Sequence, residues 1–382
     1  MSKNRFLMNH IAICSNIPVF WNNKIQDEEH CAKYFGASWM PLFVQKAKKL
    51  KYKVVSGDIA IVMLKNKEVL PDDIYVIQEL NAKHGKKLIA MGAKGAILTG
   101  AESPLFSYYF YDNLKKISQN FRYKKLFNGA YTLINQTQDD ISNLQIYFPS
   151  YSLNDKKYNT DLTKREFMVM IAANKSGYPP FPKGLKNQVI WIVHFFYKHI
   201  SLSFKIAQQS ELHSKRIEII KYFGKRNKLK LFGSAWKEYF RFQKEERAEL
   251  KEVITKLNPT FVDDKVQELS KYKFVVCFEN IAFDGYVTEK IIHCFIAGTI
   301  PIYLGAKDIK KFIPTNCFID FRNFSTLEKL ENYLDKLSNA KIKEYIKNGK
   351  KFLESENGKK YSYEVFAQDI LNTIKSIDDN NR

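Results

Sequence analysis

The sequence predicts an α/β protein with two domains, each built on a mainly parallel sheet. Its 382 residues are enough for two domains that each bury a hydrophobic core. Short apolar runs alternate with amphipathic stretches, a pattern typical of parallel sheets covered by helices. A polar run at 154–164 (NDKKYNTDLTK) separates two such regions. We therefore predict an N-terminal domain over 1–155, a C-terminal domain over 156–350, and a C-terminal helix and tail over 351–382 that can pack back on the N-terminal domain.

The first domain begins with an apolar strand at 10–15 and a helix at 38–50, which has Pro41 in its first turn. The remaining elements are short, and we assign them from their apolar residues. They are strands at 53–55 and 58–64, a helix at 73–83, and strands at 87–91 and 96–99.

The second domain has clearer elements. Its predicted strands lie at 166–173, 229–232, 274–278, 299–304 and 317–321. Its predicted helices are an amphipathic helix at 211–223, a helix from 291 that ends at Gly298, and a lysine-rich helix at 326–350; a last amphipathic helix spans 363–376. The aromatic-rich segment 184–209 fits either a helix packed on the domain or an inserted interaction surface.

The composition narrows the possible classes of protein. A net charge of +21 suits nucleic acid, an anionic membrane or phosphorylated ligands, but lysines occur in most segments, which favours a generally solvated surface. The five cysteines show no spacing typical of a metal site or a disulfide framework, so buried free thiols are expected. The apolar run at 189–197 is shorter than the roughly 20 residues of a membrane span. We expect a cytoplasmic protein that can also bind peripherally to the inner face of the cytoplasmic membrane.

The stretch 271–305 has the pattern of a ligand site. The apolar run FVVCF predicts a buried strand, and the polar residues Glu279 and Asn280 follow it directly. A second polar cluster, YVTEK at 286–290, opens the next helix. Ligands of parallel α/β sheets bind beyond the carboxyl ends of the strands, where a helix N-terminus offers backbone amides to an anion. We therefore expect an anionic ligand here.

The residues of this stretch resemble the α-1,3/4-fucosyltransferase family, glycosyltransferase family 10, in its bacterial form. The likeness lies in CFEN-x5-YVTEK, AGTIPIYLGA and FIPTNCFIDF, and it is dense over 270–324. Upstream it is weaker: ELHSKRIEIIKYF with LKLFGSAW resembles the Ser-x-Arg helix of the family and the strand and glycine that follow it, and GAESP resembles an N-terminal Glu-Ser-Pro element. MIAANK resembles a strand that ends in Ser-Asn, with Ala173 in place of the serine.

This resemblance implies a GT-B architecture, in which two Rossmann-like domains face a central cleft. It also implies an inverting transfer of L-fucose from GDP-fucose to a hydroxyl, O3 of GlcNAc or Glc, on an oligosaccharide, glycolipid or other surface glycan. Acceptors of protein glycosylation and of lipopolysaccharide biosynthesis fit this class. No cofactor is implied, and a divalent metal would at most be stimulatory.

The roles of individual residues follow from the same resemblance. Glu102 would be the base that takes the proton of the acceptor hydroxyl. The donor site would consist of two cations for the departing diphosphate, two hydrogen-bond donors to it, and a carboxylate for the ribose hydroxyls: Arg216 and Lys290, Asn280 and Tyr286, and Glu289.

Each of these roles has a plainer alternative. Glu289 can simply stabilise the N-terminus of its helix, and Tyr286 can be a packing aromatic. Glu279 can brace the loop without touching a ligand. Glu102 can be a solvated turn residue.

Two other classes of function remain open. One is a transferase of the same fold that uses another GDP-sugar. The other is a basic protein that binds nucleic acid or an anionic membrane and keeps a degenerate transferase fold. The second predicts broken motif positions, whereas the central positions are intact. No Asp-x-Asp motif for a diphosphate-bound cation appears, because Asp263 and Asp264 are adjacent, so no metal site is predicted.

Overall fold

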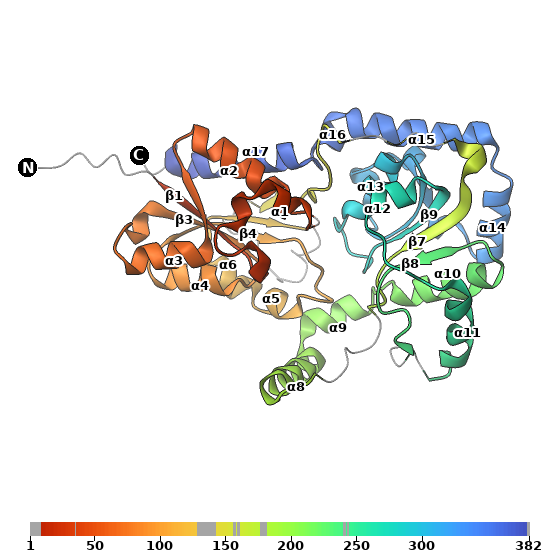
Figure 1. The fold of residues 1–382 in the computed structure, drawn as a ribbon, viewed down its shortest axis with the longest axis horizontal. Helices are drawn as coiled ribbons and strands as arrows, with labels where there is room; N and C mark the ends of the chain where they lie inside the picture. The colour runs from red at the N-terminus through yellow and green to blue at the C-terminus, as the bar shows by residue number, and fades with distance from the viewer. Residues whose placement is uncertain are drawn as a thin grey trace, which may run out of the picture. The chain divides into compact units, whose positions relative to one another are not determined.

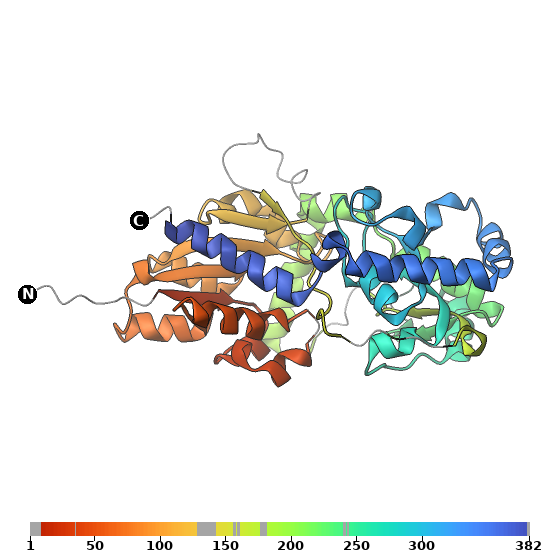
Figure 2. The same cartoon turned by 90° about the horizontal axis from the view of Figure 1, so that it is seen from above.

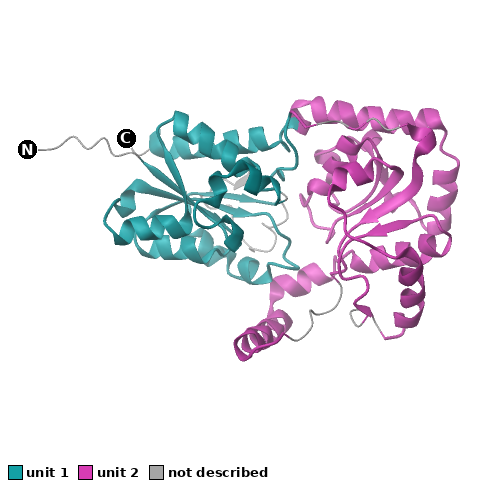
Figure 3. Ribbon diagram, viewed as in Figure 1, with its two compact units in different colours: residues 1–153, 359–382 teal, residues 154–358 magenta. Residues whose placement is uncertain are grey.

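The computed structural model describes residues 9–34, 36–127, 143–155, 158, 161–175, 182–239, 242 and 244–379. The chain forms two compact units (Figure 3). Unit 1 comprises Met1–Leu153 and Lys359–Arg382, and unit 2 comprises Asn154–Gly358. The chain enters unit 2 at the start of the polar run 154–164. It returns to unit 1 at Lys359, so residues 351–358 belong to unit 2.

Unit 1 is built on a parallel six-stranded sheet (Figure 1). The strands lie in the order β2-β1-β3-β4-β5-β6. Their bounds are β1 His10–Cys14, β2 Lys53–Ser56, β3 Ile74–Glu79, β4 Lys94–Gly100, β5 Tyr123–Leu126 and β6 Asn143–Gln145. β1 pairs with β2 on one side and with β3 on the other, so the chain changes direction across the sheet between β1 and β3.

The described part of unit 1 contains seven α-helices. They are α1 Glu28–Ala32, α2 Trp39–Lys49, α3 Gly57–Lys65, α4 Lys83–Ala90, α5 Tyr108–Asp112, α6 Leu114–Ser118 and, from the end of the chain, α17 Tyr363–Asp379. Figures 1 and 2 both show α17 beside α2. The rings of Trp39 and Phe366 meet edge to face with centroids 5.1 Å apart. Near the end of α17, the buried carboxylate of Asp378 accepts hydrogen bonds from the hydroxyls of Tyr52 and Tyr75. The C-terminal helix is therefore part of unit 1.

Three predicted elements of unit 1 were wrong. The run 58–64 forms helix α3 instead of a strand, the predicted helix 73–83 contains strand β3, and 87–91 lies in helix α4 and its end. Short apolar runs fit a buried strand and a buried helix equally well. β3 lies between β1 and β4, so it is buried on both faces and lacks the alternation that would have marked it as a strand.

Unit 2 is built on a parallel five-stranded sheet in the order β11-β10-β9-β7-β8. The strands are β7 Glu166–Ile171, β8 Lys230–Phe232, β9 Tyr272–Phe278, β10 Ile300–Leu304 and β11 Ile319–Asp320. The chain leaves β7 for β8 on one side and then places β9 on the other side of β7. Connections that run in opposite directions from neighbouring strands open a crevice at their carboxyl ends, and ligands bind there.

The helices of unit 2 are α8 Leu185–Ile200, α9 Leu202–Gln208, α10 His213–Lys225, α11 Arg247–Leu257, α12 Lys265–Leu269, α13 Glu289–Ala297, α14 Leu327–Asp335 and α15 Asn339–Glu354; α16 Glu356–Lys359 ends at the boundary of the unit. The predicted helix 326–350 is thus two helices. The break lies at Ser338, whose hydroxyl accepts a hydrogen bond from the amide of Lys341 and caps α15.

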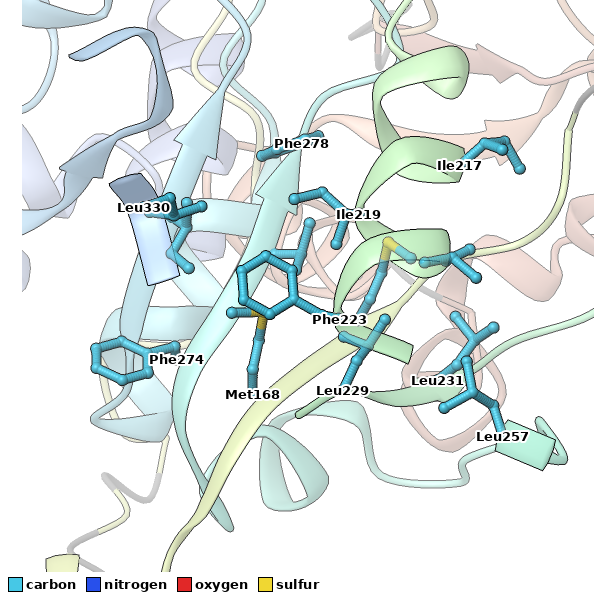
Figure 4. Packing of buried hydrophobic residues seen from close by; sticks show 14 of the residues in the cluster. Met168, Ile217, Ile219, Phe223, Leu229, Leu231, Leu257, Phe274, Phe278 and Leu330 are labelled. Carbon is cyan, nitrogen blue, oxygen red and sulfur yellow. The ribbon is translucent and has the colours of Figure 1, made fainter. Parts of the chain in front are cut away.

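The core of unit 2 lies between its sheet and α10 (Figure 4). Met168 of β7 and Phe274 of β9 pack with Ile219 and Phe223 of α10, and all four side chains are buried. This packing fixes α10 against the sheet. The five cysteines of the chain are buried and free, as predicted.

Candidate active site

The polar residues of the stretch 271–305 gather where β9 ends and α13 begins. β9 is buried along nearly all its length because it lies at the centre of the sheet, so its polar successors emerge at the carboxyl edge. Thr288 has an extended backbone and is the residue before α13. Gly298, in the left-handed conformation with φ of 64°, ends the helix. These two ends place Glu289 and Lys290 in the first turn of α13.

Glu279 is the central brace of this site. Its carboxylate is fully buried and accepts hydrogen bonds from the amide of Thr288 at 2.9 Å and from the hydroxyl of Thr288 at 2.8 and 2.9 Å. It also accepts one from Nζ of Lys290 at 2.9 Å. These partners join the end of β9 to the start of α13. Bracing is therefore the role that the structure gives Glu279.

Gly305, just beyond β10, makes room for this brace. A Cβ at that position would lie 2.5 Å from Cγ of Glu279 and 2.5 Å from the hydroxyl of Tyr303. Both distances are shorter than side chains tolerate, so a larger residue would displace the carboxylate.

Arg216 of α10 lies under the end of β9 and is 3% exposed. Its Nη2 donates hydrogen bonds to the carbonyls of Phe278 at 2.6 Å and Glu279 at 2.9 Å. The same nitrogen donates to Oδ1 of Asn280 at 3.2 Å, and Nδ2 of Asn280 lies 3.5 Å from the hydroxyl of Tyr286. The structure thus brings three predicted residues into one chain of polar contacts. In this arrangement Arg216 is held mainly by backbone oxygens.

His213, one turn before Arg216, is a neutral partner of the guanidinium. Its Nδ1 lies 3.2 Å from Nη1 of Arg216. Burial lowers the pKa of His213 to about 3, with help from Arg216, Lys175 and Lys290. A neutral imidazole can accept a hydrogen bond at this nitrogen, so His213 holds Arg216 without adding charge.

Glu289 forms ion pairs with two lysines, Lys265 of α12 and its neighbour Lys290. The Glu289 carboxylate lies 3.6 Å from Nζ of Lys265 and 3.8 Å from Nζ of Lys290. Burial would raise the pKa of Glu289, but Lys290, Lys265 and His293 outweigh it and lower that pKa to about 2. Burial acts to lower the pKa of Lys290, but Glu279 and Glu289 raise it. Both side chains are therefore charged at neutral pH.

A pocket opens at the crevice between β7 and β9. Ile171 and Ala172 line it from the end of β7, and Val275 to Phe278 line it from β9. Its charged lining consists of cations from three helices, Arg216, Lys265 and Lys290. The N-terminus of α13 adds the positive end of a helix dipole. The charge and position of this pocket suit an anionic ligand.

Glu102 lies in unit 1, just after β4. Its Oε1 accepts a hydrogen bond from the amide of Ser103 at 2.8 Å, and its backbone carbonyl accepts one from the hydroxyl of Tyr111 at 2.8 Å. A second carboxylate, Glu79 at the end of β3, accepts a hydrogen bond from the hydroxyl of Ser15 at 2.7 Å. Burial, together with the charge of Glu102, raises the pKa of Glu79. Ser15 directly follows β1 and Glu79 ends the neighbouring strand β3, while Glu102 follows β4, the next strand of the sheet.

Sequence reasoning missed several residues that support the predicted ones. Thr288 and Asp308 were not singled out, although Asp308 accepts a hydrogen bond from the amide of Gly285 at 2.8 Å and so fixes the loop between β9 and α13. Lys265, His213 and Glu79 were also missed. Only His213 carried a usable pattern, because it lies three residues before Arg216 on one helix face.

Among the described residues, no group of three or more His, Cys, Asp or Glu side chains could hold a metal ion. In the same part of the chain, no helix is both long and apolar enough to cross a membrane.

Part of the chain that contributes to the pocket is similar to a known family. Residues 198–359 match the model of glycosyltransferase family 10 (fucosyltransferase), C-terminal part. This match covers less than half of the chain. It contains all five predicted donor-site residues, whereas Glu102 lies outside it.

Relatives of this chain are similar over short stretches. The alpha-(1,3)-fucosyltransferase FucT of Helicobacter pylori is 37% identical over 123 residues, which are 31% of this chain and 25% of that protein. An alpha-(1,4)-fucosyltransferase of Arabidopsis thaliana is 38% identical over 74 residues, which are 19% of this chain and 18% of that protein. The matched segments therefore span a quarter or less of either relative.

The fold of the whole chain has a known counterpart as well. The crystal structure of HepE from Anabaena in complex with UDP-glucose aligns with a TM-score of 0.53 at 13% identity, over 97% of this chain and 100% of that one. The predicted α/β fold class, with two Rossmann-like domains of the GT-B type, is confirmed.

Proposed function

We propose that the protein is a GDP-fucose-dependent α-1,3(/4)-fucosyltransferase whose donor site is the pocket at the end of β9. The observation that carries this proposal is that Arg216 and Lys290 line that pocket, inside a stretch that matches the fucosyltransferase family. The other predicted residues are linked to these two: Asn280 to Arg216, Tyr286 to Asn280, and Glu289 to Lys290.

The charges of the pocket support a nucleoside diphosphate as leaving group. A departing diphosphate develops negative charge, and preorganised cations stabilise that charge in the transition state. Lys290 lines the pocket, and its side chain is 21% exposed, so its ammonium can reach a ligand. Arg216 lines the same pocket from α10, and we propose that its charge acts on the diphosphate while its hydrogen bonds hold the strand end.

Glu289 is proposed to accept hydrogen bonds from the ribose hydroxyls. Its pKa of about 2 keeps it ionised, and an ionised carboxylate is an acceptor at both oxygens. Asn280 and Tyr286 are proposed to donate to the diphosphate, since both side chains already lie at the end of β9.

We propose an inverting reaction in which Glu102 takes the proton of the acceptor hydroxyl as that oxygen attacks the sugar. The bond from the anomeric carbon to GDP breaks as the new glycosidic bond forms, and GDP leaves with both electrons of the broken bond. The proposed acceptor is O3 of GlcNAc or Glc on an oligosaccharide or surface glycan, including lipid-linked glycans of lipopolysaccharide type. Divalent metal is proposed to be dispensable, because side-chain cations line the pocket in which we propose that the diphosphate binds.

The roles of donor site and base can be separated by experiment. Glu102→Gln keeps the size of the side chain and removes its basicity, so transfer should fall by about 100-fold or more, as expected for loss of a general base. Binding of GDP-fucose, measured by calorimetry, should stay near the wild-type affinity. An equal loss of binding and transfer would contradict the role of Glu102 as base. The matched control is Glu238→Gln, because Glu238 neither lines the donor pocket nor neighbours Glu102 in the sequence. It should change neither GDP-fucose binding nor transfer.

The competing function is transfer of another GDP-sugar by the same site. The pocket residues are proposed to bind the nucleotide and the diphosphate, so they do not by themselves select fucose over another sugar. Calorimetry with GDP, GDP-fucose and GDP-mannose separates the two: tighter binding of GDP-mannose than of GDP-fucose would favour the competing function.

A further inference from the structure

Helix α8 (Leu185–Ile200) carries an unusual amount of exposed apolar surface. None of its residues is buried. Successive residues of a helix are about 100° apart, so residues three, four, seven and eight apart share one face. Six apolar residues of α8 fall within a sector of about 100° on this basis. We call them the apolar stripe: Leu185, Val189, Ile192, Val193, Phe196 and Ile200, each between 41% and 78% exposed.

The opposite side of α8 is less exposed than the apolar stripe. Trp191 and Phe195 are half-buried there and stack on each other with ring centroids 5.3 Å apart. Lys198 lies on the same side, and its Nζ sits 4.4 Å from the centre of the Phe204 ring in α9. The apolar stripe therefore faces away from these contacts, and Leu202, 65% exposed, continues it into α9. Figures 1 and 3 show α8 at the edge of unit 2, apart from the strands of its sheet.

The charge around the apolar stripe has a single sign. The sequence between Glu166 and Glu211 contains no Asp or Glu, but it contains five lysines, at 175, 183, 186, 198 and 205. On the helix, Lys186 and His199 border the two long edges of the stripe. An apolar face bordered by cations and aromatic residues is the pattern of a helix that lies in the interface of an anionic membrane.

The length of α8 fits the same interpretation. A helix needs about 20 apolar residues to cross the hydrocarbon core, and α8 has 16. A helix of this length can lie parallel to the membrane, with its stripe in the acyl region and its lysines among the headgroups. The alternative, a two-fold dimer through α8, would place the same lysine-rich patch against itself, and the segment between Glu166 and Glu211 offers no acidic residue to pair with it. The charge pattern therefore favours a lipid surface over a second copy of the chain.

We propose that the apolar stripe of α8 docks the protein on the surface of an anionic lipid bilayer. The stripe enters the interface, and Lys183 and Lys186 contact the negatively charged headgroups. This docking is separate from the proposed transferase activity, since no residue of the apolar stripe lines the donor pocket.

The test is sedimentation of the full chain with two kinds of vesicle, phosphatidylcholine alone and phosphatidylcholine mixed with phosphatidylglycerol. We expect binding to the mixed vesicles that weakens as salt rises. Val193→Ser with Phe196→Ser should weaken this binding by about tenfold or more, because apolar area no longer enters the interface. These side chains are exposed, so the substitutions should not disturb folding. The matched control is Phe261→Ser, a phenylalanine of unit 2 that is 80% exposed and lies off the stripe, and it should bind like wild type.

A second pair of variants tests the charge. Lys183→Glu with Lys186→Glu should weaken binding to the mixed vesicles by about tenfold, whereas Lys343→Glu with Lys347→Glu, the same change of charge on exposed residues of α15, should weaken it much less. Equal effects of the two pairs would overturn the proposal, as would wild-type binding by the stripe variant. Absence of vesicle binding together with a dimer that the stripe variant dissociates, measured by analytical ultracentrifugation, would assign the stripe to a second copy instead. Urea unfolding of each variant reports folding, and it stays informative even if the transferase proposal fails.

Discussion

Replacing Lys290 by Met probes the donor pocket most directly, because it removes the ammonium and keeps most of the aliphatic stem. In the structure Nζ of Lys290 lies 2.9 Å from Oε2 of Glu279 and 2.9 Å from the hydroxyl of Thr288. It also lies 3.8 Å from the Glu289 carboxylate. The substitution therefore removes one partner of a buried carboxylate and one cation of the pocket.

These contacts give two separate magnitudes. Removing one partner of a buried ion pair costs about 3–5 kcal/mol of unfolding free energy. Glu279 keeps its bonds to Thr288, and Lys290 is partly exposed, so we expect a smaller loss of unfolding free energy, about 2–3 kcal/mol. A hydrogen bond to a charged group contributes about 1.5–3 kcal/mol, which corresponds to a rise in the Kd for GDP of about 10- to 150-fold.

Calorimetry with GDP and urea unfolding of the same preparations measure both quantities. The matched control is Lys341→Met, which makes the same change in net charge on α15, where Lys341 pairs with Glu344 at 3.0 Å and is 47% exposed. We expect the control to bind GDP within about twofold of wild type, since exposed ion pairs contribute little. Wild-type affinity in Lys290→Met would remove Lys290 from the site, and equal weakening in both variants would show a general effect of charge.

Three further substitutions and the removal of divalent metal test other parts of the proposed site. In Arg216→Lys the new side chain cannot reach both buried carbonyls at the end of β9, so the free energy of unfolding in urea should fall by about 2–4 kcal/mol. The control Lys215→Arg, on the exposed face of α10, should change that free energy by less than about 0.5 kcal/mol. Equal stabilities of the two variants would contradict the role of Arg216 as a brace. The pKa of Glu289 is lowered from 4.5 to about 2, so its contribution to the free energy of unfolding is complete above pH 4.5 and is lost as the pH falls toward 2. Glu289→Gln should therefore lose less stability than wild type between pH 4.5 and pH 2, whereas parallel pH profiles of the two proteins would argue against the lowered pKa. The pKa of Glu79 is raised mainly by burial, so its contribution to the free energy of unfolding is present below pH 4.5 and declines as the pH rises through the raised pKa. Glu79→Gln should remove that decline. An unchanged slope of unfolding free energy against pH would be the contrary result. A chelator should leave substantial transfer activity, and complete loss restored by added metal would refute the proposed role of the side-chain cations.

The sequence predicted unit 2 well because its elements carry redundant signals. β9 and β10 are central strands with unbroken apolar runs, and α13 has a polar first turn and a C-terminal glycine. The first half of unit 1 lacked such signals. The run 58–64 begins after Ser56 and Gly57, where α3 starts with no side-chain cap, so nothing local distinguished a helix from a strand.

The sequence predicted which residues lie near the end of β9 and the start of α13, but not their contacts. Of the five residues that the resemblance selected, Arg216, Asn280 and Tyr286 form one chain of contacts, and Glu289 lies 3.8 Å from Lys290. Their role in binding the donor stays a prediction. Sequence alone could not show that Arg216 donates its hydrogen bonds mainly to backbone carbonyls or that Glu279 accepts a hydrogen bond from the amide of Thr288. Those partners come from elements distant in sequence or from backbone atoms, whose positions only the fold determines.

The central claim is that the pocket at the end of β9 binds GDP-fucose for transfer to a glycan. The measurement that tests it most directly is GDP release from a panel of GDP-sugars, with and without an N-acetyllactosamine-type acceptor. We expect GDP release from GDP-fucose that rises strongly when the acceptor is added and that falls in the Lys290→Met variant. Absence of acceptor-dependent release from GDP-fucose, with such release from another GDP-sugar, would contradict it.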